Sequence, residues 1–515
     1  MSTDAPAPTG PDLSRGVPLT ELREGVPLAG HVGEDAVMLV RQGDVVHAVA
    51  STCTHYGGPL ADGIVVGGQV RCPWHHTAFD LATGEVARPP ALQGLACWNV
   101  ATRDGMAVVT GRRERARGAA GIRRPTRPES VVVVGGGAAG AAAVITLRRE
   151  GYDGPVTLLS ADSAPPVDRP NLSKDYLAGN APEEWIPLRP DDWWAEHDVA
   201  LRLGRRATRL DAAHRRLELD DGTSLSYGAL LLATGADPIR LPLGEAGNVH
   251  YLRTLADSRA IIRASEAARS AVVLGASFIG LEVAASLRAR GLGVTVVAPE
   301  TQPLERVLGG ALGTFIRELH ESHGVAFRLG RTATSADARG VTLDDGSVVQ
   351  GDLVVAGVGV RPNLALAESA GLLLDRGVLV DQFLETSAPG VFAAGDIARW
   401  PDPHTGQRIR VEHWVVAERQ AQTAARNILG ARETFAAVPF FWSAHYDVTI
   451  SYVGHAERPE RVEVDGDVRG RDCTVRYIEG GRVTAVATIG RDRASLEAEA
   501  EMEATLGSRP GVARA

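Results

Sequence analysis

Residues 131–162 read VVVVGGGAAGAAAVITLRREGYDGPVTLLSAD, and this stretch decides the fold of the longest part of the chain. Four valines precede a glycine-rich turn, and an alanine-rich segment and a second apolar run follow it. This order predicts a buried strand, a tight turn, a helix and a second buried strand, which together form a β-α-β unit. The uncharged run is slightly short for a membrane span and is interrupted by three glycines, so we expect no membrane span here.

A second stretch, residues 271–300, repeats the pattern as AVVLGASFIGLEVAASLRARGLGVTVVAPE. Gly135 matches Gly275, and Gly140 matches Gly280. The two copies lie far apart in the chain, so they indicate one fold used twice rather than a short-period solenoid. The sequence therefore predicts two α/β nucleotide-binding domains.

The turn of the first unit is a complete G-x-G-x-x-G between a strand and a helix, which is the context that dinucleotide binding requires. Glycines let the backbone approach a pyrophosphate, and the helix N-terminus supplies positive potential. Each unit ends near an acid that could bind a ribose, and two such units predict one bound flavin and one exchanging nicotinamide. The candidate residues are Gly135, Gly137, Ala138, Ala139, Gly140 and Asp162 in the first unit, and Gly275, Ser277, Ile279, Gly280 and Glu300 in the second.

The composition is that of a folded multidomain protein, with 515 residues, of which 44% are hydrophobic and 23% charged. The formal net charge of −9 argues against a nucleic-acid partner. Four cysteines are too few for a disulfide scaffold of this size. The first residues, 1–16, hold no apolar targeting run, and we expect a cytoplasmic protein.

Composition shifts divide the chain. Short runs at 36–40, 45–49, 65–72 and 107–110 predict strands of an all-β domain, and runs at 448–453, 474–478 and 483–489 predict strands ahead of a charged helical tail near 496–506. The predicted organisation is an all-β domain at 17–110, an arginine-rich linker at 111–128, a flavin-binding domain at 129–247 and 371–432, a nicotinamide-binding domain at 248–370 and a C-terminal α+β domain at 433–515.

The all-β region contains a mixed cysteine and histidine motif, C-x-H followed by C-x-x-H, formed by Cys53, His55, Cys72 and His75. Two metal centres fit these ligands: a tetrahedral zinc site, or a Rieske [2Fe–2S] centre with two cysteines on one iron and two histidines on the other. Each half of this motif contains one cysteine and one histidine, and this arrangement on a small β domain favours the Rieske centre. We expect Cys97 to be a core residue. His76 is expected to be a loop residue, with contact to the ligands as the alternative.

Residues 17–110 resemble Rieske ferredoxins through this motif. The resemblance implies that Cys53 and Cys72 bind one iron and that His55 and His75 bind the other. Rieske proteins of respiratory complexes carry an additional cysteine in each loop, whereas the equivalent places here hold Gly58 or its neighbours and Trp74. The resemblance therefore implies a ferredoxin-type centre near the bottom of the range of about −150 to +300 mV.

Residues 129–515 resemble the two-nucleotide flavoprotein reductases, which include ferredoxin and rubredoxin reductases of oxygenase systems and apoptosis-inducing-factor-like proteins. The motifs are RPNLSK at 169–174, ATG at 233–235, GVGVRPN at 357–363, AGD at 394–396, EHW at 412–414 and FWS at 441–443. The resemblance implies cofactor-binding roles for Arg169, Lys174, Ala233, Thr234, Gly235, Gly359, Gly395, Asp396, Glu412, His413 and Trp442. It also implies that Lys174 pairs with Glu282 beside the flavin.

No cysteine occurs between Cys97 and Cys473, so the flavin cannot pass electrons to a nearby protein dithiol. The fold class is accordingly predicted as a small all-β Rieske domain, two α/β Rossmann-like domains and a C-terminal α+β domain. The predicted protein is an FAD-dependent NAD(P)H oxidoreductase of the ferredoxin reductase type. Electrons would pass through the [2Fe–2S] centre to a protein acceptor such as an oxygenase, a P450 or a ferredoxin.

Within this hypothesis, Lys174, Glu282, His413 and Trp442 position the reacting groups. NADH is expected over NADPH, because Glu300 follows the second strand of the nicotinamide unit and no Arg or Lys occurs at 298–304. Two alternatives remain open at this point: an NAD(P)H oxidase or quinone-type reductase with a sensing Rieske domain, and a redox-responsive interaction protein of the apoptosis-inducing-factor group.

Overall fold

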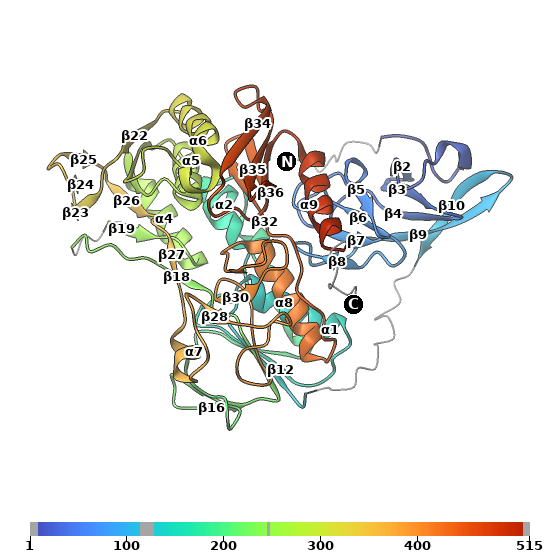
Figure 1. Ribbon diagram of the computed structural model, residues 1–515, viewed down its shortest axis with the longest axis horizontal. Helices are drawn as coiled ribbons and strands as arrows, with labels where there is room; N and C mark the ends of the chain where they lie inside the picture. Colours follow the sequence, from blue (N-terminus) through green and yellow to red (C-terminus); the bar gives the residue numbers. More distant parts are fainter. Residues whose placement is uncertain (1–8, 114–127, 245–247, 508–515) are drawn as a thin grey trace. The chain divides into compact units, whose positions relative to one another are not determined.

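The computed structural model describes residues 9–113, 128–244 and 248–507, and Figure 1 shows the order of its elements. The chain forms two compact units. The first contains the described residues of Met1–Ile122 and Arg491–Arg514, and the second contains those of Arg123–Gly490. Residues 1–8 of the predicted lead, 114–127 of the predicted linker and 245–247 at the predicted domain boundary lie outside the described residues.

The first unit contains two antiparallel sheets, as the short alternating runs predict. The six-stranded sheet has the order β1-β10-β9-β4-β3-β2, and the four-stranded sheet has the order β5-β6-β7-β8. The strands are β1 (Val17–Pro18), β2 (Leu28–Val32), β3 (Asp35–Gln42), β4 (Val45–Ala50), β5 (Ile64–Val66), β6 (Gln69–Arg71), β7 (Ala78–Asp80), β8 (Val86–Arg88), β9 (Cys97–Arg103) and β10 (Met106–Arg113). Short 3-10 helices occur at η1 (Leu19–Glu21) and η2 (Leu60–Asp62).

The run predicted as one strand at 65–72 is instead the hairpin of β5 and β6. Gly67 and Gly68 form its turn with φ values of 59° and 78°. A two-residue turn with positive φ at both positions favours glycine, and it fits the right-handed twist of a hairpin. The paired glycines therefore divide the run into two strands.

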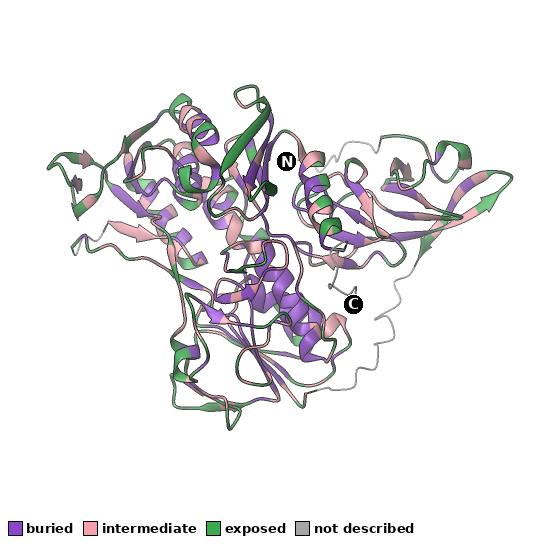
Figure 2. Cartoon of the chain, viewed as in Figure 1, coloured by how far each residue is buried: buried purple, intermediate pink, exposed green. Residues whose placement is uncertain are grey.

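The second unit begins with the predicted β-α-β pattern on a parallel sheet of order β13-β12-β11-β17-β29. All four valines of β11 are buried, as a parallel strand covered on both faces requires. Helices α1 and α8 pack together and are largely buried (Figure 2). The elements are β11 (Val131–Val134), α1 (Ala138–Arg149), β12 (Val156–Leu159), β13 (Val199–Arg202), β17 (Ala229–Leu232), β29 (Val391–Ala393) and α8 (Trp414–Ile428).

The repeated pattern forms a second parallel sheet of order β19-β26-β20-β21-β22. Its elements are β19 (Val249–Tyr251), α4 (Leu255–Ala267), β20 (Ser270–Leu274), α5 (Phe278–Ala289), β21 (Gly293–Ala298), α6 (Glu305–Ser322), β22 (Val325–Leu329) and β26 (Leu353–Ala356). Thr254 begins α4 with a capping box, in which its side chain accepts from the Asp257 backbone and the Asp257 side chain accepts in return. The two β-α-β patterns thus form two separate sheets, as predicted.

Smaller elements connect these sheets. Three antiparallel groups are β14 (Ala207–Asp211) with β15 (Arg216–Leu219) and β16 (Ser224–Ser226), β18 (Ala236–Pro238) with β27 (Val360–Pro362), and β23 (Ala333–Asp337) with β24 (Gly340–Leu343) and β25 (Val348–Gln350). A further group joins β28 (Val378–Leu379), β30 (Ala398–Pro401) and β31 (Arg408–Ile409). The short helical segments are η3 (Arg169–Ser173), α2 (Asp175–Ala178), η4 (Glu183–Trp185), α3 (Asp191–Glu196) and α7 (Ala365–Ser369).

The end of the second unit is an antiparallel sheet of order β32-β33-β36-β35-β34, and helix α6 shares its core. Its strands are β32 (Phe440–His445), β33 (Val448–Gly454), β34 (Arg461–Asp467), β35 (Asp472–Glu479) and β36 (Arg482–Ile489). The helix that follows, α9 (Asp492–Gly507), groups with the first unit by its contacts, although the predicted C-terminal domain at 433–515 includes it. None of the helices in the described ranges has both the length and the apolar character needed to cross a membrane.

Candidate functional site

The first candidate site lies in two loops of the first unit, which bring the predicted metal ligands together. Nδ1 of His55 lies 3.2 Å from Nδ1 of His75. Cys53 and Cys72 are buried and share a hydrogen bond that raises the pKa of Cys53 and lowers the pKa of Cys72. The two thiols therefore face each other, and so do the two imidazole nitrogens.

Local backbone hydrogen bonds hold each loop in the same way. The Gly57 amide donates to the Cys53 carbonyl over 3.0 Å, and the His76 amide donates to the Cys72 carbonyl over 3.1 Å. Gly58 must lack a side chain, because a Cβ there would lie 2.7 Å from the Cys72 sulfur. Burial lowers the pKa of His55 to about 3, so its imidazole is neutral, which is the form that binds a metal. This donor set fits a [2Fe–2S] cluster with two sulfur and two nitrogen ligands.

Helix α9 supplies two acids beside one of these loops, the buried Glu499 and the half-buried Glu503. Oε2 of Glu499 lies 3.0 Å from Nδ1 of His76 and 3.6 Å from Nη1 of Arg71. Arg71 also donates to Glu503 over 2.7 Å, and Glu503 pairs with Arg88. His76 and Glu499 have no exposed area. The expected loop residue is thus held in place by a carboxylate from the far end of the sequence.

The second candidate site is a cavity of about 770 Å³ in the second unit. It lies at the carboxyl ends of β11 and β12, where α/β sheets commonly bind their ligands. The predicted residues that line it are Gly135, Gly137, Ala138, Ala139, Asp162, Arg169, Lys174, Ala233, Thr234, Gly235, Ile279, Glu282, Gly395, Asp396, Glu412, His413 and Trp442. Gly140, Gly275, Ser277, Gly280, Glu300 and Gly359 are outside that lining.

The glycine turn approaches its neighbours as closely as the motif requires. Gly135 has a φ of 121°, and a Cβ there would lie 2.0 Å from the Ala233 carbonyl oxygen. A Cβ at Gly140 would lie 1.8 Å from the Gly135 oxygen, so this glycine lets α1 pack against the turn. The N-terminus of α1 therefore opens directly into the cavity, where a pyrophosphate could accept from backbone amides.

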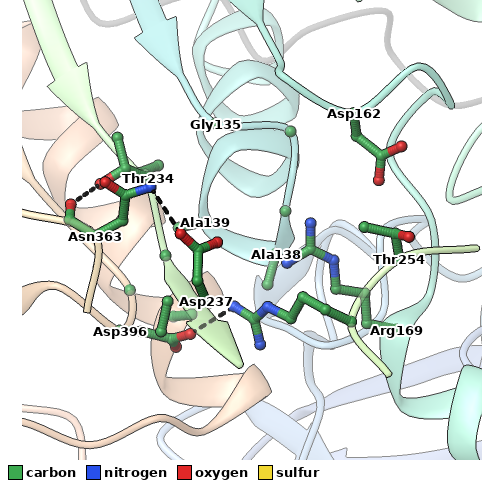
Figure 3. Close-up of a pocket in the computed structure, with 18 of the residues that line it drawn as sticks. Gly135, Ala138, Ala139, Asp162, Arg169, Thr234, Asp237, Thr254, Asn363 and Asp396 are labelled. Atoms are coloured by element: carbon green, nitrogen blue, oxygen red, sulfur yellow. Dashed lines mark hydrogen bonds and ion pairs between the residues drawn. The ribbon is translucent and has the colours of Figure 1, made fainter. Parts of the chain in front are cut away.

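Charged side chains surround the same cavity (Figure 3). Asp396 forms a 2.8 Å ion pair with Arg253, a residue that no sequence motif indicated. Burial lowers the pKa of Arg169 to about 10, which leaves its guanidinium charged at neutral pH. Thr234 donates to the Asn363 carbonyl over 2.8 Å, and this bond joins two of the predicted motifs. An adenine dinucleotide, with two phosphates and several hydroxyls, fits these groups.

The predicted pair of Lys174 and Glu282 is present at the cavity wall. Nζ of Lys174 lies 2.9 Å from Oε2 of Glu282, and the Ser173 hydroxyl donates to the same oxygen over 2.6 Å. Ser443 donates to the other carboxylate oxygen over 2.6 Å. Glu282 is 5% exposed, so these three donors stabilise its charge in a buried position.

His413 lies at the N-terminus of α8 and faces the cavity. Burial lowers its pKa to about 3, so the ring is neutral. Its Nδ1 is buried and finds no hydrogen-bond partner among the described residues. A buried ring nitrogen without a partner fits a site completed by a bound polar cofactor.

The second glycine turn has the same construction as the first. Gly275 has a φ of 105°, and a Cβ there would lie 2.4 Å from the Gly357 carbonyl oxygen. The Ser277 hydroxyl donates to the same carbonyl over 2.9 Å, which explains how serine replaces the middle glycine. Glu300 follows β21 and lies 3.8 Å from Arg306 of α6. Arg306 lies just beyond residues 298–304, the segment on which the expected preference for NADH over NADPH was based.

A set of polar residues lies behind Glu282, and no sequence motif indicated it. These residues come from η3, the β32–β33 hairpin and α6, and local sequence patterns do not bring these segments together. They are Ser173, Ser443, His445, His320 and Tyr446. Ser173 and Ser443 belonged to quoted motifs, RPNLSK at 169–174 and FWS at 441–443, and neither carried an assigned role there.

Family comparisons match three regions of the chain. The model described as pyridine nucleotide-disulphide oxidoreductase matches residues 129–421. The Rieske [2Fe-2S] domain matches residues 17–99, and the reductase C-terminal domain matches residues 440–508. The Rieske match covers the loops with the four predicted metal ligands, and the oxidoreductase match covers most of the residues that line the cavity.

Individual proteins are also similar to this chain. The chain is 38% identical over 355 residues to the anthranilate 1,2-dioxygenase system ferredoxin–NAD(+) reductase component of Burkholderia cepacia, covering 67% of this chain and 87% of that protein. It is 31% identical over 516 residues to apoptosis-inducing factor 3 of Homo sapiens, and the match covers 96% of this chain and 84% of that protein. The crystal structure of the covalent putidaredoxin reductase–putidaredoxin complex aligns with a TM-score of 0.71 and 34% identity, covering 74% of this chain and 94% of that chain.

Proposed function

Because the chain belongs to the pyridine nucleotide-disulphide oxidoreductase family and also contains a Rieske [2Fe–2S] domain, we propose that it passes electrons from NADH through FAD to the [2Fe–2S] centre and on to a protein acceptor. The protein is an oxidoreductase that uses FAD, NAD(P)H and a [2Fe–2S] cluster. Bound FAD accepts two electrons as a hydride and can release them singly to a one-electron centre.

One observation carries this proposal: no cysteine lines the dinucleotide cavity, although the family is named for disulphide chemistry. All four cysteines are buried, and two of them belong to the paired loops of the first unit. Electrons that enter the cavity as a hydride therefore cannot leave through a protein dithiol in its wall. The four ligands in the first unit supply another centre on the same chain.

Residues of the cavity have distinct proposed roles. Asp396, fixed by Arg253, would accept hydrogen bonds from the sugar-alcohol chain of FAD, and Asp162 would accept from its ribose. Arg169 would bind the phosphates. Lys174, held by Glu282, would position the flavin ring without adding net charge to the cavity.

Two further side chains complete the proposed ring site. His413 stays neutral and can form one hydrogen bond at its buried Nδ1, and Trp442 provides an apolar edge that excludes water. In the first unit, the exposed aromatic rings of Tyr56 and Trp74 adjoin the histidine ligands. Such rings suit a transient protein contact, and we assign this face to the electron acceptor.

The acceptor is proposed to be an oxygenase component, a P450 or a ferredoxin. The Burkholderia cepacia relative is named as the reductase of a dioxygenase system, and the structural relative was crystallised with putidaredoxin. NADH is proposed as the preferred donor, because the Glu300 carboxylate would repel a 2′-phosphate.

A pair of cysteine variants tests the proposal. Cys72→Ser removes one ligand and should abolish the cluster, whereas Cys97→Ser changes a buried cysteine outside the motif and should keep it. Both should reduce ferricyanide with NADH at the wild-type rate, because that small acceptor reaches the flavin. Cys72→Ser alone should lose reduction of cytochrome c, used as a one-electron protein probe. Full cytochrome c reduction by Cys72→Ser would show that electrons leave directly from the flavin.

The whole-length match to apoptosis-inducing factor 3 supports a second candidate, a redox-responsive interaction protein. That function requires a reduced protein–nicotinamide complex that persists and changes its association state. Analytical ultracentrifugation with and without NADH under anaerobic conditions separates the two. A stable change in mass with slow turnover supports the second candidate, and rapid turnover without a change in mass supports the first.

A further inference from the structure

A row of buried polar side chains runs from the cavity wall to the surface of the second unit. Ser443 donates to Oε1 of Glu282 over 2.6 Å, and Nε2 of His445 lies 3.1 Å from the Ser443 hydroxyl oxygen. Nδ1 of His445 lies 3.3 Å from Nε2 of His320, whose Nδ1 lies 3.5 Å from the Tyr446 hydroxyl. Neither His320 nor His445 has any exposed area.

Ser443, His445, His320 and Tyr446 can each both donate and accept a hydrogen bond, and Glu282 can donate once it has taken up a proton. The protons can all point toward Glu282, with both imidazoles protonated at Nε2 and the tyrosine donating to His320. When Glu282 takes up a proton from the cavity, they can all point outward, with Glu282 donating to Ser443 and both imidazoles protonated at Nδ1. A row that has two such states can pass a proton by successive short transfers and then reset.

The charge states of the rings suit such transfers. Burial lowers the pKa of His445 to about 3 and lowers the pKa of His320 well below its ordinary value. Both rings are therefore neutral at physiological pH, and each has one nitrogen that donates and one that accepts. Burial also raises the pKa of Tyr446 to about 12, so its hydroxyl keeps its proton between transfers.

Tyr446 connects the row to the surface. Its ring stacks on the exposed His323, with ring centroids 3.6 Å apart and planes 9° from parallel. Tyr446 occupies the left-handed region, with a φ of 57°, in the tight turn between β32 and β33. An aromatic residue rarely adopts this conformation, and such a backbone outlier points to a use for the side chain.

The proposed reaction leaves a proton to be removed. Oxidation of one NADH by two one-electron acceptors yields NAD⁺, two reduced acceptors and one proton. The hydride carries that proton into a cavity whose wall includes Glu282. We infer that Glu282, Ser443, His445, His320 and Tyr446 form the path by which this proton leaves the cavity. This inference rests on the proposed electron transfer from NADH.

His445→Gln tests the path during turnover. The amide can still bond to Ser443 and His320, but it cannot exchange a proton between two ring nitrogens. With excess ferricyanide and NADH, a pH-indicator dye in weakly buffered anaerobic stopped flow should report proton release slowed at least about tenfold. Bleaching of the flavin by NADH should keep its wild-type rate. His404→Gln, a histidine of the same unit outside the row, is the matched control and should release protons normally.

A second measurement needs no turnover. In protein labelled with ¹⁵N-histidine, the His445 ring N–H should exchange with D₂O through Tyr446 and His320. Tyr446→Phe removes the outer hydroxyl while keeping the ring stack, so it should slow that exchange severalfold. If His445→Gln does not fold, Tyr446→Phe still tests the path through this exchange measurement.

The outcomes separate this inference from the proposed function. If the wild-type protein fails to reduce ferricyanide with NADH, the proposed function is wrong, and the exchange measurement still tests the path. Unchanged proton release in His445→Gln, equal slowing in His404→Gln, or unchanged exchange in Tyr446→Phe would each overturn the path. Slowed release confined to His445→Gln, together with slowed exchange in Tyr446→Phe, would support it.

Discussion

Glu499 of α9 provides a direct test of whether the last helix stabilises the cluster-binding unit. Its carboxylate lies 3.0 Å from His76 and 3.6 Å from Arg71, and the side chains of all three are at most 3% exposed. Glu499→Ala would leave the buried guanidinium and the imidazole without this acceptor. Removing one partner of a buried charged pair costs about 3–5 kcal/mol. Glu499→Gln keeps an acceptor oxygen but loses the charge, so we expect a smaller loss of about 1–3 kcal/mol.

The free energy of unfolding can be followed for this unit alone through the visible absorbance of its cluster in urea. With a urea dependence of about 2 kcal/mol per M, Glu499→Ala should lower the midpoint by about 1.5–2.5 M. Flavin fluorescence should report an unchanged midpoint for the second unit. The matched control is Glu497→Gln, which breaks an exposed ion pair with Arg493 on the same helix and should cost under about 0.5 kcal/mol. A wild-type cluster midpoint in Glu499→Ala would refute the docking of α9.

Three further predictions concern the cluster loops, the second β-α-β unit and the row of polar residues behind Glu282. Gly58→Ala should lower iron and sulfide content per chain, because its Cβ would meet the Cys72 sulfur, whereas Gly111→Ala, with open space at its Cβ, should keep both. Glu300→Ala should raise kcat/KM for NADPH relative to NADH by removing a carboxylate and releasing Arg306, and unchanged relative values would contradict that assignment. His445 has a pKa of about 3 when folded against an ordinary 6.5, so the unfolded chain binds more protons as pH falls below 6.5. Lowering the pH to 5 should therefore cost about 2 kcal/mol more stability in wild type than in His445→Gln, measured by urea unfolding at pH 7 and pH 5; equal losses would contradict a buried neutral ring.

The sequence predicted the parts of the fold that are formed by residues close together in the chain. A four-valine strand followed by G-x-G-x-x-G carries its own turn, helix and ligand geometry, and the structure has these elements at 131–149. The same holds for the two loops with Cys53 and Cys72, each held by backbone bonds within the loop. Such features can be predicted because the hydrogen bonds that form each turn lie within a few residues of one another.

The features that the sequence analysis missed depend on distant partners. Glu499 and Glu503 are one helical turn apart on α9, but their partners Arg71, His76 and Arg88 lie near the other end of the chain. A charged helical pattern predicts a helix and does not say which surface it covers. The row through His445 and His320 likewise depends on the packing of α6 against the C-terminal sheet.

In the proposed function, electrons from NADH reach the [2Fe–2S] cluster through the flavin. The direct measurement is rapid-freeze electron paramagnetic resonance after mixing the anaerobic wild-type protein with NADH. The signal of a reduced histidine-ligated cluster, with its low average g-value, should grow after NADH has bleached the flavin, because the cluster takes one of the two electrons that the flavin received. Cys72→Ser should show flavin reduction by NADH without that signal. A wild-type cluster that dithionite reduces but NADH leaves oxidised, with the flavin fully bleached, would contradict the account.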